Sequence, residues 1–191
     1  ADIKEIRRRA AEGPAAARLH GRLTAFDILT PYTAMLRQRI ITEVQDGDRP
    51  LTGLKIAVDA GNGAGGFYAT RVLAPLGADV SASVYLEPDG SFPNHVPNPE
   101  NQEAMESIRR AVLTGGCDLG LIFDTDVDRA GAVEADGTEL GRNRLIALAA
   151  AIAAEQAPGS TIVTDSVTSD QLAEFIEKKL GCRHHRFKRG Y

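Results

Sequence analysis

Short apolar runs alternate with helical patterns along the middle of the chain. The runs predict strands at 54–59, 79–86 and 118–123, and the spacing between them predicts helices at 66–76 and 102–113. Strands that alternate with helices indicate a largely parallel sheet with right-handed crossovers. We therefore expect an α/β fold, with a mostly parallel β-α-β-α-β domain and helices packed on the sheet.

A second α/β pattern begins near residue 140. It predicts helices at 144–156 and 169–180 and strands at 161–164 and 183–187. Two strands bury too little apolar surface to be stable by themselves. We therefore expect an incomplete second α/β unit, which either belongs to a longer protein or depends on a partner.

The N-terminal part of the chain differs from both patterns. Residues 1–30 carry charges of both signs and show no clear core pattern, so we expect a connector. Thr30 and Pro31 form a favourable N-cap and N1 pair for a helix that ends before residue 45. Helical spacing places four apolar side chains on one face of this helix: Tyr32, Met35, Leu36 and Ile40.

Bulk composition is that of an ordinary globular protein, with 43% hydrophobic and 25% charged residues. A net charge of -4 gives no nucleic-acid footprint, so small solutes are the expected partners. No apolar run reaches the roughly 18 residues that span a membrane, and no signal peptide is evident, which predicts a cytoplasmic protein. Cys117 and Cys182 lack metal-site spacing and are expected to be buried, reduced thiols.

Three aspartates at alternate positions, Asp124, Asp126 and Asp128, directly follow a predicted strand and precede Arg129. Three carboxylates this close require a counter-ion, because like charges oppose one another's ionisation. Oxygen ligands without histidine or cysteine suit Mg²⁺ or Ca²⁺ rather than zinc. A calcium EF-hand loop is excluded, because it needs glycine and glutamate where this chain has Arg129 and Ala135. The remaining alternative is a solvated acidic turn.

The segment 61–66, Gly-Asn-Gly-Ala-Gly-Gly, fits the dinucleotide pattern G-x-G-x-x-G and lies between a predicted strand and helix. Glu87 stands at the acidic position of that fingerprint, so a dinucleotide-binding module is an alternative function. Asp59 opposes this reading, because its charge would repel a pyrophosphate at the helix N-terminus. A third reading is that the glycines only permit a tight turn.

The loop 87–100 holds four of the nine prolines and is expected to be stiff and non-helical. Such a loop usually shapes a surface or a domain interface. His95 within it is either an acid/base group or, as we expect, a structural histidine.

The C-terminal stretch 178–191 carries six Lys/Arg residues, two histidines and no acid. In an acidic chain this cluster attracts anions, and phosphate on a small molecule is the natural candidate. A nucleic-acid patch and a solvated edge are the alternatives.

Taken together, these motifs occur in an order that resembles the α-D-phosphohexomutases, the phosphoglucomutase/phosphomannomutase family. The aspartate loop resembles that family's magnesium loop, usually written D-G-D-G-D-R. The segments 58–66 and 89–95 resemble second-domain signatures, and 164–169 resembles the opening strand of the third domain. The resemblance implies three parts: a linker and connecting helix at 1–50, domain 2 with the magnesium loop at 51–138, and the N-terminal part of domain 3 at 139–191.

The resemblance also implies roles for individual residues. The three aspartates are expected to bind Mg²⁺ together with a phosphate on an active-site serine, and Arg129 to act as a catalytic, phosphate-neutralising group. A substrate-binding loop is implied at Lys188, Arg189 and Gly190, with Lys188 also catalytic. Thr125 and Val127 replace the two glycines of the family loop. Because φ > 0 is costly for a β-branched residue, we expect ordinary backbone angles there if the loop binds metal.

The parent enzyme implied by the resemblance interconverts hexose 1-phosphate and 6-phosphate through phosphoserine and a bisphosphate. The serine loop, the sugar-binding loop and the terminal phosphate-binding domain of that family are not found in this sequence. We therefore expect these 191 residues to be inactive alone. Their expected partners are the hexose phosphate substrate and the remaining domains of the parent chain.

Overall fold

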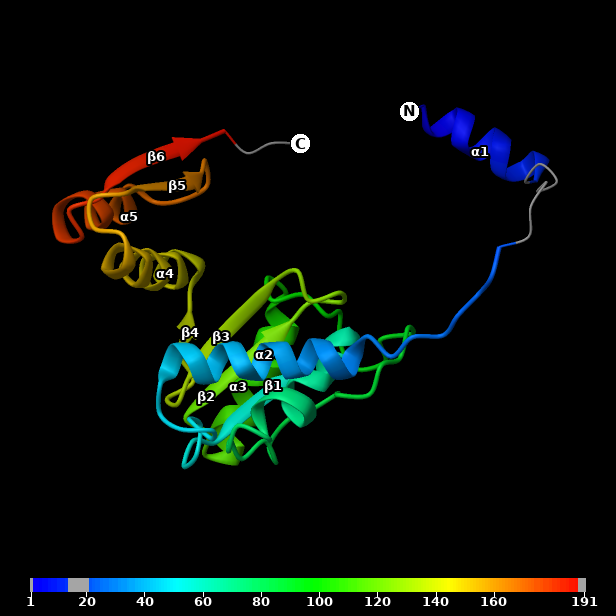
Figure 1. The fold of residues 1–191 in the computed structure, drawn as a ribbon, viewed down its shortest axis with the longest axis horizontal. Helices are drawn as coiled ribbons and strands as arrows, with labels where there is room; N and C mark the ends of the chain where they lie inside the picture. The colour runs from blue at the N-terminus through cyan, green and yellow to red at the C-terminus, as the bar shows by residue number, and fades with distance from the viewer. Residues whose placement is uncertain (1, 14–20, 189–191) are drawn as a thin grey trace. The chain divides into compact units, whose positions relative to one another are not determined.

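The computed structural model describes residues 2–13 and 21–188 (Figure 1). Contacts divide the chain into two units, Ala1–Pro31 and Tyr32–Tyr191. The first unit contains helix α1, Ile3–Glu12, which buries none of its residues. Across the described residues, no helix has both the length and the apolar content that crossing a bilayer demands.

The remaining elements follow as an alternation of helical segments and strands. The segment η1 is 3₁₀-helical, and η2 and η3 are π-helical. In chain order the elements are α2 Leu29–Val44, β1 Ile56–Asp59, η1 Ala64–Gly66, η2 Tyr68–Leu73, α3 Gln102–Gly115, β2 Leu119–Phe123, β3 Ala130–Glu134, β4 Glu139–Leu140, α4 Arg142–Gln156, β5 Thr161–Asp165, α5 Asp170–Glu174, η3 Phe175–Lys179 and β6 Arg183–Phe187.

The expected α/β class is confirmed, but the central sheet is mixed rather than mostly parallel. Its strand order is β1-β2-β3-β4, and only β1 and β2 pair in parallel. Strands β2 and β3 pair antiparallel, with Phe123 opposite Ala130, and so do β3 and β4. The loop 124–129 explains the direction of β3, because a parallel crossover needs a dozen or more residues.

Two predicted elements between β1 and α3 are irregular. The expected strand 79–86 touches β1 only through isolated parallel bridges, from Lys55 to Asp79 and from Asp59 to Val84. Between them the Val58 N–H donates to the Ser83 hydroxyl, which takes the place of a ladder bond. The single helix expected at 66–76 is instead divided into η1 and η2.

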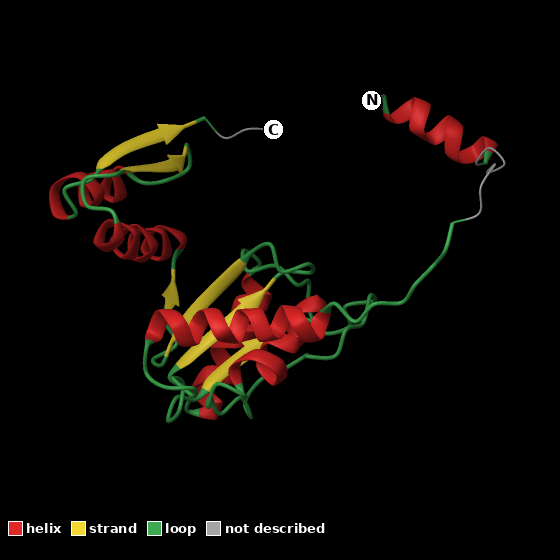
Figure 2. Ribbon diagram, in the orientation of Figure 1, coloured by secondary structure: helices red, strands yellow, loops and turns green. Residues whose placement is uncertain are grey.

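Helical segments lie on both faces of the central sheet (Figure 2). The strand period of two assigns the buried side chains to these faces. On one face Ala57 and Ile122 join a core built on α3, which includes Ile108. On the other face Val58 and Phe123, which directly follow Ala57 and Ile122 in the chain, join a core built on η2. Helical α3 therefore covers one face and η2 the other, as a doubly covered sheet requires.

The start of helix α2 differs from the prediction. The helix begins at Leu29, and the Asp27 carboxylate accepts the N–H groups of Leu29 and Thr30. Its buried residue is Thr33, whereas Met35 is 55% exposed, so the predicted apolar face is wrong in part. Of the predicted apolar residues, Tyr32 packs its ring against Phe67, in the segment that follows η1.

The second predicted pattern forms a two-stranded parallel sheet, in which β5 pairs with β6. Ser169 caps α5 by accepting the Leu172 N–H, and Gly181 has φ +63° at the turn before β6. Helix α4 begins at Arg142, two residues before the predicted start, and the Asn143 side chain accepts the Ser169 N–H. Both cysteines are buried and free, as expected.

We predict that Gly66→Ala destabilises the protein by roughly 2–4 kcal/mol. A β-carbon at this position would lie 1.8 Å from the Leu86 carbonyl oxygen, so the backbone would have to shift. Gly90→Ala is the matched control, since a β-carbon there meets no atom within 4 Å. Urea unfolding of the two variants measures the difference, and equal midpoints would contradict this packing.

Candidate metal centre

The aspartate loop connects β2 to β3 at the carboxyl end of β2. The Asp124 N–H donates to the Arg129 carbonyl at 3.2 Å, and the Val127 N–H donates to the Asp124 carbonyl at 3.4 Å. These two bonds close the loop into a tight bend. Ligands of open α/β sheets bind at this end of the strands.

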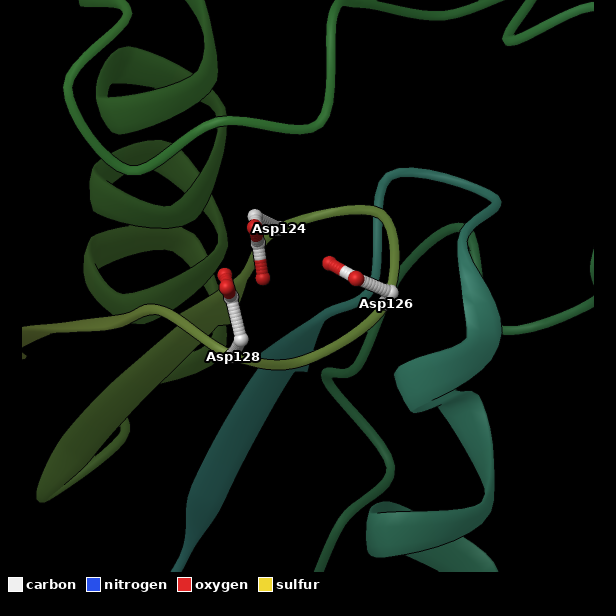
Figure 3. A group of neighbouring side chains, drawn as sticks. All are labelled: Asp124, Asp126 and Asp128. Atoms are coloured by element: carbon white, nitrogen blue, oxygen red, sulfur yellow. The ribbon is translucent and has the colours of Figure 1, made fainter. Parts of the chain in front are cut away.

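The three predicted ligands lie together. One carboxylate oxygen from each of Asp124, Asp126 and Asp128 lies within 4.8 Å of the other two. Figure 3 shows the carboxylates turned into the space enclosed by the bend. Asp124 is buried, whereas Asp126 and Asp128 are exposed. An all-carboxylate set of this size fits a hard divalent cation such as Mg²⁺.

Arg129 holds the buried aspartate in place. Its backbone N–H donates to Asp124 Oδ1 at 3.0 Å, and its Nε and Nη2 contact Asp124 Oδ2 at 2.9 and 2.8 Å. Its Nη1 donates to Asn98 Oδ1 at 3.1 Å. Such a fork of donors fixes a carboxylate more firmly than a single charge does. Arg129 therefore connects the aspartate loop to the proline loop.

The electrostatics of the loop shift the pKa values of Asp124 and Asp128 in opposite directions. Burial opposes ionisation of Asp124, but hydrogen bonds from the Arg129 N–H, Asp128 and the Arg129 side chain outweigh it, so the pKa of Asp124 is lowered. The pKa of Asp128 is raised by its hydrogen bond to Asp124 and by the charges of Asp124 and Asp126. Asp128 is therefore the carboxylate that repulsion penalises most clearly, and a bound cation would relieve that repulsion.

The expectation of ordinary backbone angles in this loop is wrong at one position. Val127 has φ +66°, in the left-handed region. For a β-branched residue this conformation is an outlier and costs on the order of 1–3 kcal/mol. The loop therefore keeps the left-handed turn although a valine occupies the position of a family glycine.

A buried carboxylate joins the segments beside the metal loop. Asp59, at the end of β1, is fully buried and accepts hydrogen bonds from the Gly61 N–H at 2.9 Å and the Ser107 hydroxyl at 2.6 Å. His95 Nε2 lies 3.0 Å from the same carboxylate, and His95 Nδ1 lies 3.1 Å from the Val96 carbonyl. These contacts support the structural reading of His95.

The first four N–H groups of the glycine loop are engaged within the protein. Besides the Gly61 N–H on Asp59, the N–H groups of Asn62, Gly63 and Ala64 donate to the carbonyls of Tyr85, Ala60 and Thr125. An anion-binding turn requires such groups to point at the ligand. Four consecutive donors are satisfied internally, so the geometry does not favour the dinucleotide-binding alternative.

The predicted substrate-binding residues fall at the end of the described chain. Lys188 is exposed and follows β6. Arg189 and Gly190 lie outside the described residues. Within β6, Arg186 pairs with Asp170 at 2.9 Å, and His184 Nε2 lies 2.8 Å from the Thr164 hydroxyl. These two basic-stretch residues are therefore engaged within their own unit.

Three contributors to the centre were missed: Asn98, Ser107 and the left-handed Val127. Asn98 and Ser107 reach the centre or its supporting network from segments distant in sequence, and no spacing rule connects them to Arg129 or Asp59. The signal for Val127 was present, because the family loop carries glycine at that position and glycine commonly marks φ > 0.

Comparison with known proteins agrees with this geometry. Residues 30–137 match the sequence profile described as phosphoglucomutase/phosphomannomutase, alpha/beta/alpha domain II. The chain is 34% identical over 170 residues to a phosphoglucomutase of Neisseria gonorrhoeae, covering 89% of this chain and 35% of that protein. It therefore spans about a third of the length of this relative.

Solved structures show the same similarity. A phosphoglucomutase/phosphomannomutase family protein from Burkholderia thailandensis superimposes with a TM-score of 0.70 and 30% identity, covering 82% of this chain and 33% of that one. An Aspergillus fumigatus N-acetylphosphoglucosamine mutase, solved with GlcNAc-6P and magnesium, has a TM-score of 0.55 and 18% identity, covering 83% of this chain and 32% of that one. The second likeness concerns the fold alone.

We predict that Asp128→Asn raises the Tm of the metal-free protein slightly, by roughly 1 °C. Because the pKa of Asp128 is raised in the folded state, its ionised form opposes folding at neutral pH. The gain should vanish below the ordinary pKa range of aspartate, where Asp128 is protonated in both states. Calorimetry in EDTA across this pH range measures it, and a lower Tm at neutral pH would contradict the repulsion.

Proposed function

Because this chain belongs to the phosphoglucomutase/phosphomannomutase family, we propose that it supplies the magnesium-binding segment of a hexose phosphate mutase. The observation that carries the proposal is the cluster of Asp124, Asp126 and Asp128, whose oxygens lie within 4.8 Å of one another at the end of β2. A solvated acidic turn would not require Arg129 to fix the buried member of the set. The all-carboxylate ligand set supports the choice of a hard divalent ion such as Mg²⁺.

The reaction we propose is the interconversion of hexose 1-phosphate and 6-phosphate, through a phosphoserine and a bisphosphate. Mg²⁺ bound to the three aspartates would supply charge neutralisation at the transferred phosphoryl group. In phosphoryl transfer the protein contributes mainly positioning and electrostatic stabilisation. This chain contributes the carboxylates that hold the ion and the cationic group beside them.

Arg129 has two tasks in this proposal. Its Nε and Nη2 keep Asp124 ionised and oriented for the ion. Its side chain is also 52% exposed, so a substrate or serine phosphate can approach the guanidinium from solvent. The two tasks are compatible, because a guanidinium carries five donor hydrogens in a fixed fork.

We further propose the division into a linker and connecting helix at 1–50, domain 2 at 51–138 and the N-terminal part of domain 3 at 139–191. Lys188, Arg189 and Gly190 would meet the phosphosugar. The serine and sugar-binding loops would come from the parts of the enzyme that this chain does not cover, since it spans about a third of its relatives. The 191 residues alone should therefore not turn over substrate.

We predict that Asp126→Asn in the full-length protein lowers Mg²⁺ affinity and mutase activity by about a hundredfold. The substitution removes one of three anionic ligands while keeping the size of the side chain. Asp46→Asn is the matched control, because it makes the same chemical change at an exposed loop position after α2. Calorimetric Mg²⁺ titration and a coupled mutase assay give the two readouts. Near-normal activity of Asp126→Asn would contradict the metal role.

A further inference from the structure

Val127 is the residue through which the exposed part of the metal loop contacts the protein core. From Thr125 to Ala130 it alone is partly buried, while its neighbours Asp126 and Asp128 are exposed. Its side chain packs against the core cluster that contains Val58 and Phe123. The Val127 side chain therefore points into the protein, whereas the carboxylates of Asp126 and Asp128 on either side of it point into the bend (Figure 3).

The glycine loop forms the surface that Val127 contacts. A β-carbon added to Gly65 would lie 3.2 Å from Val127 Cγ2 and 2.9 Å from Phe123 Cδ2. A side chain at position 65 would therefore occupy the space that Val127 uses. We call this space, bounded by Gly65 and Phe123, the valine socket.

A second contact fixes the other side of Asp126. The Ala64 N–H donates to the Thr125 carbonyl at 2.9 Å. A β-carbon added to Gly63 would lie 2.8 Å from that carbonyl oxygen, so glycine is needed for the approach. Asp126 is therefore bracketed by two residues held on the glycine loop, Thr125 by its backbone and Val127 by its side chain.

This packing explains why valine occupies a position with a left-handed backbone. A glycine or asparagine could adopt φ +66° with less strain but would not fill an apolar socket in the same way. Packing of the side chain in the socket offsets this strain and opposes a change of the turn, and loss of loop freedom before binding favours ligand affinity. The strain and the packing thus act on the same two carboxylates.

We infer that Val127 is a positioning residue for the metal site, and that the glycine loop serves as its socket rather than as a phosphate cradle. The inference rests on the proposed function, because it assumes that Asp124, Asp126 and Asp128 bind Mg²⁺. The apolar Val127 side chain has no ligand atom to offer the ion. It sets the conformation from which Asp126 and Asp128 bind.

The test is Mg²⁺ titration of the full-length protein by calorimetry, with two variants. Val127→Ala removes the methyl groups that fill the socket, whereas Val127→Thr keeps the branched shape and can turn its hydroxyl toward solvent. We expect Val127→Ala to weaken Mg²⁺ binding about tenfold, as loss of groups that orient metal ligands does, and Val127→Thr to stay within about twofold. Equal affinity of Val127→Ala and the unsubstituted protein would overturn the inference, and so would an equal loss in both variants.

Hydrogen exchange of the unsubstituted protein gives a second measurement that does not depend on the folding of a variant. We expect added Mg²⁺ to slow exchange in peptides that cover 61–66, because binding stabilises the residues packed on that loop. Unchanged exchange there in the presence of bound Mg²⁺ would overturn the inference alone. Absence of Mg²⁺ binding by the unsubstituted protein would overturn the proposed metal role as well, so the two failures are distinguishable.

Discussion

One buried carboxylate organises the end of the sheet at which the site is built. Asp59 is fully buried, and its carboxylate contacts the Gly61 N–H, the Ser107 hydroxyl and the His95 ring in place of water. An unpaired carboxylate would be too costly in that position, so the three partners and their segments must stay in place together. The end of β1, the glycine loop, the proline loop and α3 therefore behave as one assembly.

The metal loop depends on this assembly at two places. The proline loop, held by His95, brings Asn98 to the Nη1 of Arg129. The glycine loop, held by Asp59, contacts the Val127 side chain at Gly65 and donates the Ala64 N–H to the Thr125 carbonyl. The aspartates are thus supported from both sides by segments that contain no ligand of their own, as is common around metal sites.

Sequence reasoning was most successful where local chemistry decides the structure. Strands β2 and β6 and the gathering of the three aspartates follow from short-range patterns. It failed where long-range geometry decides. The antiparallel course of β3 could have been deduced from the short loop before it, whereas the pairing of Asp59 with His95 could not, since these residues share no spacing rule. Val127 was misjudged because propensity was given more weight than packing.

The glycine loop has a consequence for how this sequence can change over time. Gly61 lies against Pro97 and His95, Gly65 against Phe123 and Val127, and Gly66 against Leu86. Gly61 and Gly65 are thus matched to side chains of different segments, whereas Gly66 meets a backbone carbonyl that no substitution at position 86 removes. We expect a genetic suppressor of an altered Gly65 to arise in the metal loop. Gly61 has φ +52°, so a side chain there stays strained even if the proline loop makes room for it.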